Sequence, residues 1–166
     1  MSSYIVKETP GDTSWFVHDR FGMFIHFGLY ALPARHEWVK TREFISEEKY
    51  QTYFDHFNPD LMDAREWAKK AKAAGMKYAV LTAKHHEGFC MFDTAYTDYK
   101  CTNTKAGRDL VREYVDAFRA EGIRIGFYYS LIDWHHPDYD TDFPAYLKYL
   151  RASVELLCTN YGKIGG

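Results

Sequence analysis

The chain has 166 residues, of which 46% are hydrophobic and 27% are charged, a composition that predicts one globular domain over residues 1–166. The formal net charge of −2 and the isoelectric point near 6.4 exclude a general electrostatic attraction to nucleic acid or to an anionic membrane.

The cysteines indicate a reducing environment. Cys90, Cys101 and Cys158 are odd in number and lack CxxC spacing, which favours free thiols over a disulfide framework and argues against a structural zinc site. The N-terminal residues form no apolar core of a signal peptide, and no window approaches the about 18 apolar residues of a membrane span. We therefore expect a soluble, cytoplasmic protein.

Capping residues and glycines mark the first helices. Thr13 can cap a short helix through Trp15 and Phe16. Residues 29–45 are expected to be irregular, and Ser46 begins a helix with two glutamates in its positive first turn. A further helix runs from a cap at Asp63 to Gly75, with the apolar positions Ala64, Trp67, Ala68 and Ala71.

Two longer helices are predicted further along the chain. The first begins at Asp109 and ends at Gly122, and its apolar face comprises Leu110, Val111, Tyr114, Val115 and Phe118. Pro144 suits the first turn of the last helix, which Gly162 ends. The apolar face of that helix comprises Tyr146, Leu147, Leu150, Val154, Leu157, Cys158 and Tyr161.

Three short runs with β-branched and aromatic content alternate with these helices. They cover residues 23–28, 78–83 and 123–130, and each is too short for an ordinary helix. The order strand, helix, strand, helix, strand, helix predicts a parallel sheet with helices outside it.

All three predicted strands place polar side chains at their C-terminal ends, which is the ligand-binding end in parallel α/β folds. These side chains are His26 near the end of the first strand, His85, His86 and Glu87 at the end of the second, and Tyr128 on the third, with Asp133 and Trp134 just beyond it. The even placement predicts the active face of a (β/α)-barrel. A simpler alternative is that the histidines only cap a strand at the surface. Since adjacent strand residues point to opposite faces, His85 and His86 can share a pocket only if the strand twists or ends between them.

Four separated runs carry a family resemblance. DRFGMFIHFG, HEWVK, VLTAKHHEGFCMFDT and GFYYSLIDWHHPDY resemble, in this order and spacing, the N-terminal half of the catalytic barrel of glycoside hydrolase family 29, the α-L-fucosidases. The resemblance implies an α/β fold of the (β/α)8 TIM-barrel type, present as about half a barrel. It also implies a retaining hydrolase that removes terminal α-L-fucose from glycans by double displacement, with no cofactor.

The resemblance further implies a set of residues lining the fucose pocket, namely His26, Glu37, Trp38, His85, His86 and Tyr128. Physical chemistry is consistent with that set. A fucose ring offers vicinal hydroxyls and one methyl patch, so it suits neutral donor–acceptor side chains beside an aromatic wall such as Trp38. Neutral histidine, with one donor and one acceptor nitrogen, fits a hydroxyl group well.

The catalytic carboxylates are the main departure from the family pattern. Retaining glycosidases need two carboxyl groups about 5–5.5 Å apart. The resemblance implies an aspartate nucleophile on the strand that follows Ile164, so we expect it to lie beyond Gly166. Within the chain, Glu37 is a weak candidate for a catalytic role. A complete barrel takes about 250 residues, so we expect little activity from residues 1–166 alone.

Two other hypotheses remain open. One is a non-catalytic half-barrel that binds sugar weakly or self-associates. The other is a metal hydrolase built on His26, His85, His86 and His135, which the lack of an i, i+4 ligand spacing disfavours. An open parallel sheet has bare edges and a bare inner face, where we expect residues such as Ile25, Val80, Leu81 and Phe127, with strand alternation deciding which of them point inward. A homodimer or higher assembly, formed through these surfaces, is therefore predicted.

Overall fold

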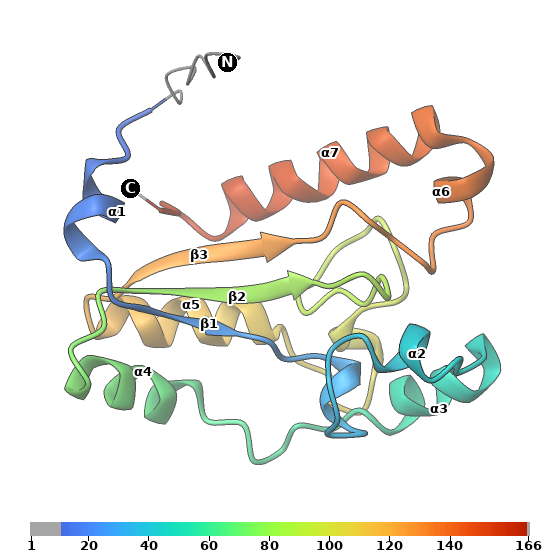
Figure 1. The fold of residues 1–166 in the computed structure, drawn as a ribbon, viewed down its shortest axis with the longest axis horizontal. Coiled ribbons are helices and arrows are strands. Elements are labelled where there is room, and N and C mark those ends of the chain that lie inside the picture. Colours follow the sequence, from blue (N-terminus) through green and yellow to red (C-terminus); the bar gives the residue numbers. More distant parts are fainter. Residues whose placement is uncertain (1–10, 166) are drawn as a thin grey trace, which may run out of the picture.

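Three parallel strands in the order β1-β2-β3 form the sheet of the protein in a computed structural model that describes residues 11–165 (Figure 1). β1 is Gly22–Ile25, β2 is Tyr78–Lys84 and β3 is Arg124–Tyr129. In the register, Gly22 pairs with Tyr78, and Tyr78 pairs with Arg124, so the strands start level. The predicted α/β order and parallel sheet are confirmed, with strand ends shifted by no more than three residues.

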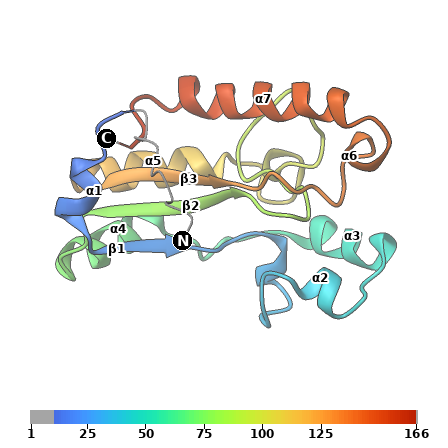
Figure 2. The same ribbon diagram turned by 45° about the horizontal axis from the view of Figure 1, so that its top comes forward.

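Helices precede, connect and follow the strands. α1 (Ser14–Asp19) precedes β1, and the connection to β2 holds α2 (Val39–Arg42), α3 (Glu47–His56) and α4 (Ala64–Ala73). α5 (Leu110–Ala120) joins β2 to β3, and α6 (Asp138–Thr141) and α7 (Phe143–Asn160) follow β3. Two 3-10 turns lie at Leu29–Ala31 and Cys101–Asn103. Figure 2 shows α4 and α5 behind the sheet and α7 alongside β3. None of the helices described could cross a membrane by its length and hydropathy.

The predicted helix caps are confirmed at three of the four predicted positions. The Ser46 hydroxyl accepts a hydrogen bond from the backbone of α3, and Asp63 and Asp109 do the same for α4 and α5. The expected cap at Thr13 is wrong, because its side chain makes no such bond. Instead, the backbone N–H of Ser14 donates to Oδ1 of Asp12 at 2.9 Å.

The prediction missed two short helices and misjudged one helix face. α2 lies inside the segment 29–45 that was expected to be irregular, and α6 lies in the loop after β3. On α7, Cys158 is exposed, although it was placed on the apolar face. The buried positions of α7 are Tyr146, Ser153 and Leu157. Cys158 follows Leu157 directly and is rotated by about 100° from that row.

The register decides which side chains point to each face of the sheet. Ile25, Leu81 and Phe127 are lateral neighbours in one row, so they point the same way, and Leu81 is completely buried beneath the helices. Phe127 packs against Tyr114 of α5, with ring centroids 6.3 Å apart. Of the predicted inner-face residues, only Val80 lies on the other face. As expected, strand alternation decides which of the four point inward, and it assigns Ile25, Leu81 and Phe127 to the helix side of the sheet.

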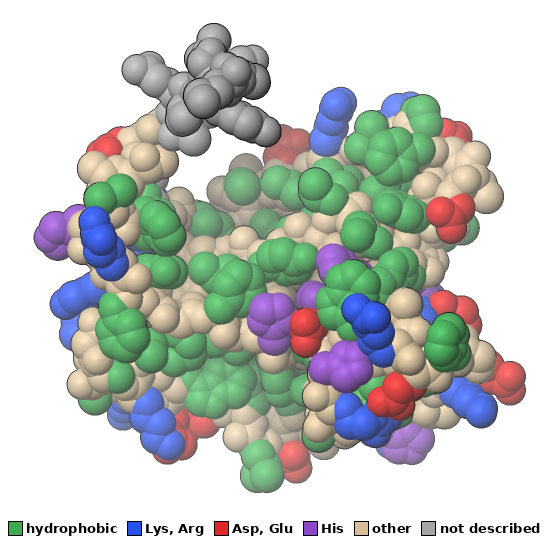
Figure 3. Space-filling view, in the orientation of Figure 1, with side chains coloured by type: hydrophobic (Ala, Val, Ile, Leu, Met, Phe, Trp, Pro, Cys, Tyr) green, Lys and Arg blue, Asp and Glu red, His purple; other side chains and the backbone are tan. Residues whose placement is uncertain are grey.

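Within residues 11–165, the face opposite α4 and α5 is bare except at the start of the sheet. Phe24, which is 52% exposed, is the register neighbour of Val80 there. Figure 3 shows apolar side chains gathered over the strands on this face, with histidines beside them at one end. At the other end, α1 covers the start of the sheet, where the Phe16 and Tyr78 rings lie 5.6 Å apart.

After α7 the chain returns to the outer edge of β3. The backbone N–H of Gly165 donates to the carbonyl of Ile125 at 2.8 Å. Arg124 donates from its guanidinium to the carbonyl of Gly165 at 3.2 Å. The segment that ends at Gly165 therefore lies where a further strand of the sheet would begin.

Candidate active site

The C-terminal ends of the three strands bring aromatic and imidazole rings together. His26 follows β1, His85 follows β2, and Tyr128 is the penultimate residue of β3. The ring centroids of His26 and His85 are 5.7 Å apart, and that of Tyr128 lies 5.9 Å from His85 and 6.4 Å from His26. These three predicted site residues, from three different strands, thus share one location.

A second group of rings continues this surface. Trp38, from the turn before α2, lies 4.8 Å from the His86 ring. Trp134, from the loop after β3, lies 5.3 Å from His86 and 5.4 Å from Trp38. We refer to these side chains together as the ring cluster: His26, Trp38, His85, His86, Tyr128 and Trp134. The implied pocket residues with rings are therefore all in one place.

The end of β2 explains how two successive histidines can join the same cluster. The strand stops at Lys84, and its register with β3 shifts between Thr82 and Lys84. Strict alternation no longer applies to the next residues, and the rings of His85 and His86 lie 4.3 Å apart. The condition set by the sequence, that the strand twists or ends there, is met.

A buried ion pair joins the end of β2 to the loop that carries Trp134 of the ring cluster. Nζ of Lys84 lies 2.8 Å from Oδ2 of Asp133, and the other carboxylate oxygen accepts backbone N–H groups from His135 and His136 at 3.0 and 2.9 Å. The backbone N–H of Trp134 donates to the carbonyl of His86 at 2.8 Å. The loop carrying Trp134 is thus bonded to Lys84, the last residue of β2, and to His86, which follows the strand.

Gly88 is required for this close approach. Its φ of +86° is in the left-handed region, and a Cβ atom there would lie 2.5 Å from Oδ1 of Asp133 and 2.8 Å from Cβ of His135.

Sequence reasoning missed the Lys84–Asp133 pair, because a lysine in a strand gives no signal of its partner. It also missed Tyr30, whose ring lies 5.1 Å from His85 and whose hydroxyl is 2.9 Å from Oγ1 of Thr82.

Burial favours the neutral form of two histidines in the cluster. Desolvation, followed by the nearby His85 and Lys84, lowers the pKa of His86 to about 4. Nδ1 of His86 lies 2.5 Å from Oγ of Ser130, a hydrogen bond that fixes the ring. Desolvation and His85 also lower the pKa of His26, against a smaller opposing effect of Glu37. At neutral pH both rings therefore offer one donor and one acceptor nitrogen.

His85 faces a buried carboxylate. Its Nδ1 lies 3.5 Å from Oε2 of Glu87, and the two side chains are only 3% and 1% exposed. Neither atom has a hydrogen-bond partner within residues 11–165. Because Glu87 occupies the Nδ1 side of the ring, Nε2 of His85 is the nitrogen left for a ligand.

The remaining candidates differ in position. Glu37 is half-buried and close enough to influence the pKa of both His26 and His86. His135 instead stacks on Tyr99, with ring centroids 4.0 Å apart. Within the part of the chain that the structure describes, no group of three or more His, Cys, Asp or Glu side chains could hold a metal ion. The geometry therefore gives the metal-hydrolase alternative no support.

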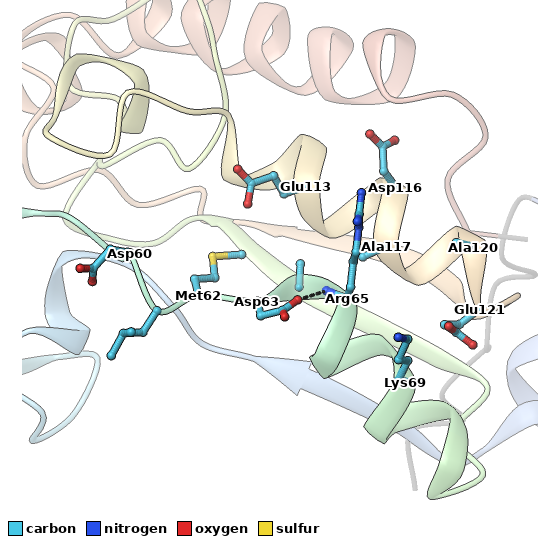
Figure 4. A pocket seen from close by; sticks show the side chains of 12 residues that line it. Asp60, Met62, Asp63, Arg65, Lys69, Glu113, Asp116, Ala117, Ala120 and Glu121 are labelled. Atoms are coloured by element: carbon cyan, nitrogen blue, oxygen red, sulfur yellow. Dashed lines mark hydrogen bonds between the residues drawn. The ribbon is translucent and has the colours of Figure 1, made fainter.

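Two hollows differ in their relation to the cluster. One of about 420 Å³ borders Trp134. A larger one, of about 780 Å³, lies between α4 and α5 on the helix side of the sheet (Figure 4). Its lining contains exposed charges such as Arg65 and Asp116 but no histidine and no aromatic side chain. We place the site at the strand ends, because the groups suited to chemistry converge there.

Comparison with known proteins agrees with the family resemblance. A family model described as Alpha-L-fucosidase matches residues 6–163. The chain belongs to the α-L-fucosidase family. This family member is 32% identical to the alpha-L-fucosidase of Dictyostelium discoideum over 159 residues, which are 82% of this chain and 34% of that protein. It is 37% identical to the tissue alpha-L-fucosidase of Rattus norvegicus over 145 residues, 77% of this chain and 31% of that protein.

Solved structures of α-L-fucosidases superpose closely on this family member. Isoenzyme 1 from Paenibacillus thiaminolyticus gives a TM-score of 0.87 at 59% identity, covering 91% of this chain and 40% of that one. A family 29 enzyme from Bacteroides thetaiotaomicron, trapped as a covalent intermediate with 2-fluoro-fucosyl fluoride, gives 0.85 at 37% identity, covering 90% and 38%. AlfC from Lactobacillus casei in complex with its α-L-fucose product gives 0.81 at 29% identity, covering 92% and 59%. The chain spans about a third of the length of the curated relatives.

Proposed function

We propose that this chain forms the N-terminal half of a (β/α)8 barrel and carries the fucose-binding side of a retaining α-L-fucosidase site. The family membership and the fucose-type ligands of the related structures support the substrate. Two repeats of strand, helix and strand support the barrel, as does the return of Gly165 to the edge of β3.

The observation that carries the proposal is the ring cluster at the C-terminal ends of the strands. The lowered pKa values keep the rings of His26 and His86 neutral at pH 7. His26 can then both donate to and accept from sugar hydroxyls, while His86, whose Nδ1 is bonded to Ser130, offers its Nε2. Trp38 supplies an aromatic surface for the apolar side of the sugar. Tyr128 and His85 complete the set of contacts, and Glu37 accepts hydrogen bonds from hydroxyl groups.

Double displacement needs a carboxylate nucleophile and a second carboxyl group about 5–5.5 Å from it. Glu87 is enclosed, which leaves Glu37 as the half-buried carboxylate beside the cluster. We propose that Glu37 binds sugar and that the nucleophile is not among residues 11–165. Residues 1–166 alone should then turn over fucosides little or not at all, because the covalent step is absent.

Binding and turnover are tested separately. Turnover of an aryl α-L-fucoside by the chain is expected to be at most a small fraction of that of a complete relative. Binding of deoxyfuconojirimycin, measured by calorimetry, should weaken in His26→Ala, His86→Ala and Trp38→Ala. Loss of each buried sugar contact should cost about 1–3 kcal/mol. The controls are His18→Ala and His56→Ala, which replace exposed rings outside the cluster. Equal effects in both groups would remove the case for this site.

We also propose that the chain self-associates as a homodimer or higher assembly. The bare sheet face around Phe24 supports this assembly, since parallel sheets occur almost only with both faces covered.

The free thiols of Cys90, Cys101 and Cys158 support a cytoplasmic location, which cell fractionation would test.

A further inference from the structure

Glu87 is a buried carboxylate that the proposed fucose contacts do not use. Its side chain is 1% exposed, and its Oε2 has no hydrogen-bond partner within residues 11–165. An ionised carboxylate is costly to bury unless a partner compensates the charge that is removed from water. The position of Glu87 therefore raises the question of which group it serves.

Three tyrosine rings lie around the carboxylate without bonding to it. Burial raises the pKa of Tyr30, Tyr50 and Tyr99, and the charge of Glu87 adds to the rise in each case. The Tyr30 hydroxyl is bonded to Oγ1 of Thr82 at 2.9 Å. The Tyr50 hydroxyl is buried and has no hydrogen-bond partner among the residues described. These hydroxyls thus enclose Glu87 but do not compensate it.

The buried cations of the chain are paired elsewhere, which leaves one neighbour for Glu87. Within residues 11–165 the two buried lysines face other carboxylates, Lys84 with Asp133 and Lys40 with Glu47. The polar atom nearest to Oε2 of Glu87 is Nδ1 of His85, at 3.5 Å. His85 is 3% exposed, and this nitrogen likewise has no hydrogen-bond partner in the part of the chain that the structure describes. Two unpaired atoms therefore face each other, shielded from water.

The carboxylate determines which nitrogen of the ring carries the proton. An ionised carboxylate only accepts hydrogen bonds, so Nδ1 of His85 must hold the proton that points at Glu87. In a neutral imidazole the other nitrogen, Nε2, is then an acceptor. The distance of 3.5 Å is longer than that of a formed N–H···O bond, and contacts of this kind often shorten when a ligand occupies the site.

We propose that Glu87 is a positioning residue, which holds His85 with its proton on Nδ1 so that Nε2 accepts a hydrogen bond from a ligand hydroxyl group. The inference rests on the proposed fucose site, because it specifies how one side chain of that site recognises the sugar. His85 is then selective for a hydroxyl that donates. A fluorine atom at the same place on the ligand cannot satisfy it.

Nitrogen NMR of the full chain tests the position of the proton directly. Correlation of ring protons with ¹⁵N distinguishes a protonated ring nitrogen from an unprotonated one. In the wild-type chain at pH 8, where imidazoles are ordinarily neutral, we expect a protonated Nδ1 and an unprotonated Nε2 at His85. A protonated Nε2 would overturn the proposal, and this measurement requires no variant to fold.

The same spectra report on Glu87→Gln. The amide can donate as well as accept, so the single tautomer of His85 should be replaced by a mixture of two. The ring of His86 is bonded to Ser130 and serves as the internal control, because the position of its proton should not change. A single Nδ1–H tautomer that persists at His85 in Glu87→Gln would show that the carboxylate does not set it.

Binding of methyl α-L-fucoside tests what the contact does for a ligand. This probe is uncharged, so the charge of Glu87 does not attract it directly. Glu87→Gln should weaken its binding about three- to tenfold, and His85→Ala at least as much. The double variant should bind no more weakly than His85→Ala, because Glu87 acts only through the imidazole. A further loss in the double variant would indicate a purely structural role and would overturn the proposal.

Fluorinated ligands identify the group that His85 recognises. The probes are methyl α-L-fucosides with fluorine in place of the 2-, 3- or 4-hydroxyl group. At least one of them should bind the wild-type chain more weakly than the parent fucoside, and that loss should be absent in His85→Ala. Losses that are the same in both proteins would count against Nε2 as an acceptor.

Asp109→Asn is the matched control for the loss of a carboxylate. Asp109 caps α5 and accepts a hydrogen bond from the Tyr161 hydroxyl at 2.6 Å, so its partners are not in the ring cluster. This variant should keep both the tautomer of His85 and the affinity for methyl α-L-fucoside. If the fucoside binds while Nε2 of His85 is protonated, the positioning role is wrong and the fucose site stands. If the wild-type chain does not bind the fucoside, the proposed function fails and recognition through Nε2 fails with it.

Discussion

Nζ of Lys84 and Oδ2 of Asp133 lie 2.8 Å apart with side chains that are 0% and 2% exposed, so β2 and the loop after β3 are joined by an ion pair shielded from water. Removing one partner would leave an uncompensated buried charge. We therefore expect Lys84→Met to lower the free energy of unfolding by about 3–5 kcal/mol, measured by urea denaturation.

An exposed pair in the same chain provides the control. Lys70 and Glu66 lie at the same N–O distance of 2.8 Å, but their side chains are 75% and 56% exposed. Lys70→Met should cost far less than Lys84→Met, because water replaces the lost partner. The double variant of Lys84→Met and Asp133→Asn should be less destabilised than the sum of the single variants. Similar losses at Lys84 and Lys70 would show that burial does not determine the effect.

Gly88 and Gly75 form a second matched comparison. Both have a φ of +86°, but a Cβ atom at Gly75 would meet nothing within 4 Å, whereas one at Gly88 would meet Asp133 at 2.5 Å. Gly75→Ala should lower the free energy of unfolding by about 1–2 kcal/mol, because a non-glycine residue is strained in the left-handed conformation. Gly88→Ala should cost clearly more, because the Asp133 carboxylate must move. Equal unfolding free energies for the two variants would contradict the close packing described at Gly88.

The lowered pKa of His86 makes stability depend on pH. Its pKa is about 4 in the folded chain, against an ordinary value of 6.5, so between these values the unfolded chain binds a proton that the folded chain does not. The contribution of the neutral ring is complete above pH 6.5 and is lost as the pH falls towards 4. The difference in unfolding free energy between the wild-type chain and His86→Gln should therefore shrink over this window. Urea denaturation at several pH values measures it, and a constant difference would count against burial as the cause.

Phe24 offers a test of self-association. It is 52% exposed on the bare face of the sheet, and an acidic side chain there would place charge in the proposed contact. We expect Phe24→Asp to weaken association at least tenfold in sedimentation equilibrium. Phe44→Asp, at a position that is 93% exposed and away from the strands, should leave it unchanged. A wild-type chain that is monomeric at micromolar concentration would overturn the proposed assembly.

Local signals in the sequence predicted the elements well but not the relations between them. The caps at Ser46, Asp63 and Asp109 were predictable because each bonds within its own helix turn. The two faces of the sheet were not, because the register that aligns Leu81 with Phe127 depends on pairing between strands.

The candidate site shows the same division. The rings could be located at the strand ends from sequence alone, because parallel strands place their C-terminal residues at one edge. The buried ion pair beside these rings could not be predicted, because Lys84 and Asp133 are 49 residues apart and meet only after β2 and β3 have paired. Trp134 was predicted to lie just beyond the end of the third strand, but the hollow beside it depends on the separate placement of α3.

The end of β2 assigns three successive residues to three different neighbours. Lys84 turns to Asp133, His85 faces Glu87, and His86 lies against Trp38. Which neighbour each residue contacts depends on its position relative to the register shift after Thr82. A one-residue insertion or deletion here would thus reassign all three side chains together, whereas a single substitution changes one. Natural length variation among homologues should consequently be found in the outer loops and be absent between Thr82 and Gly88, even where the individual residues differ.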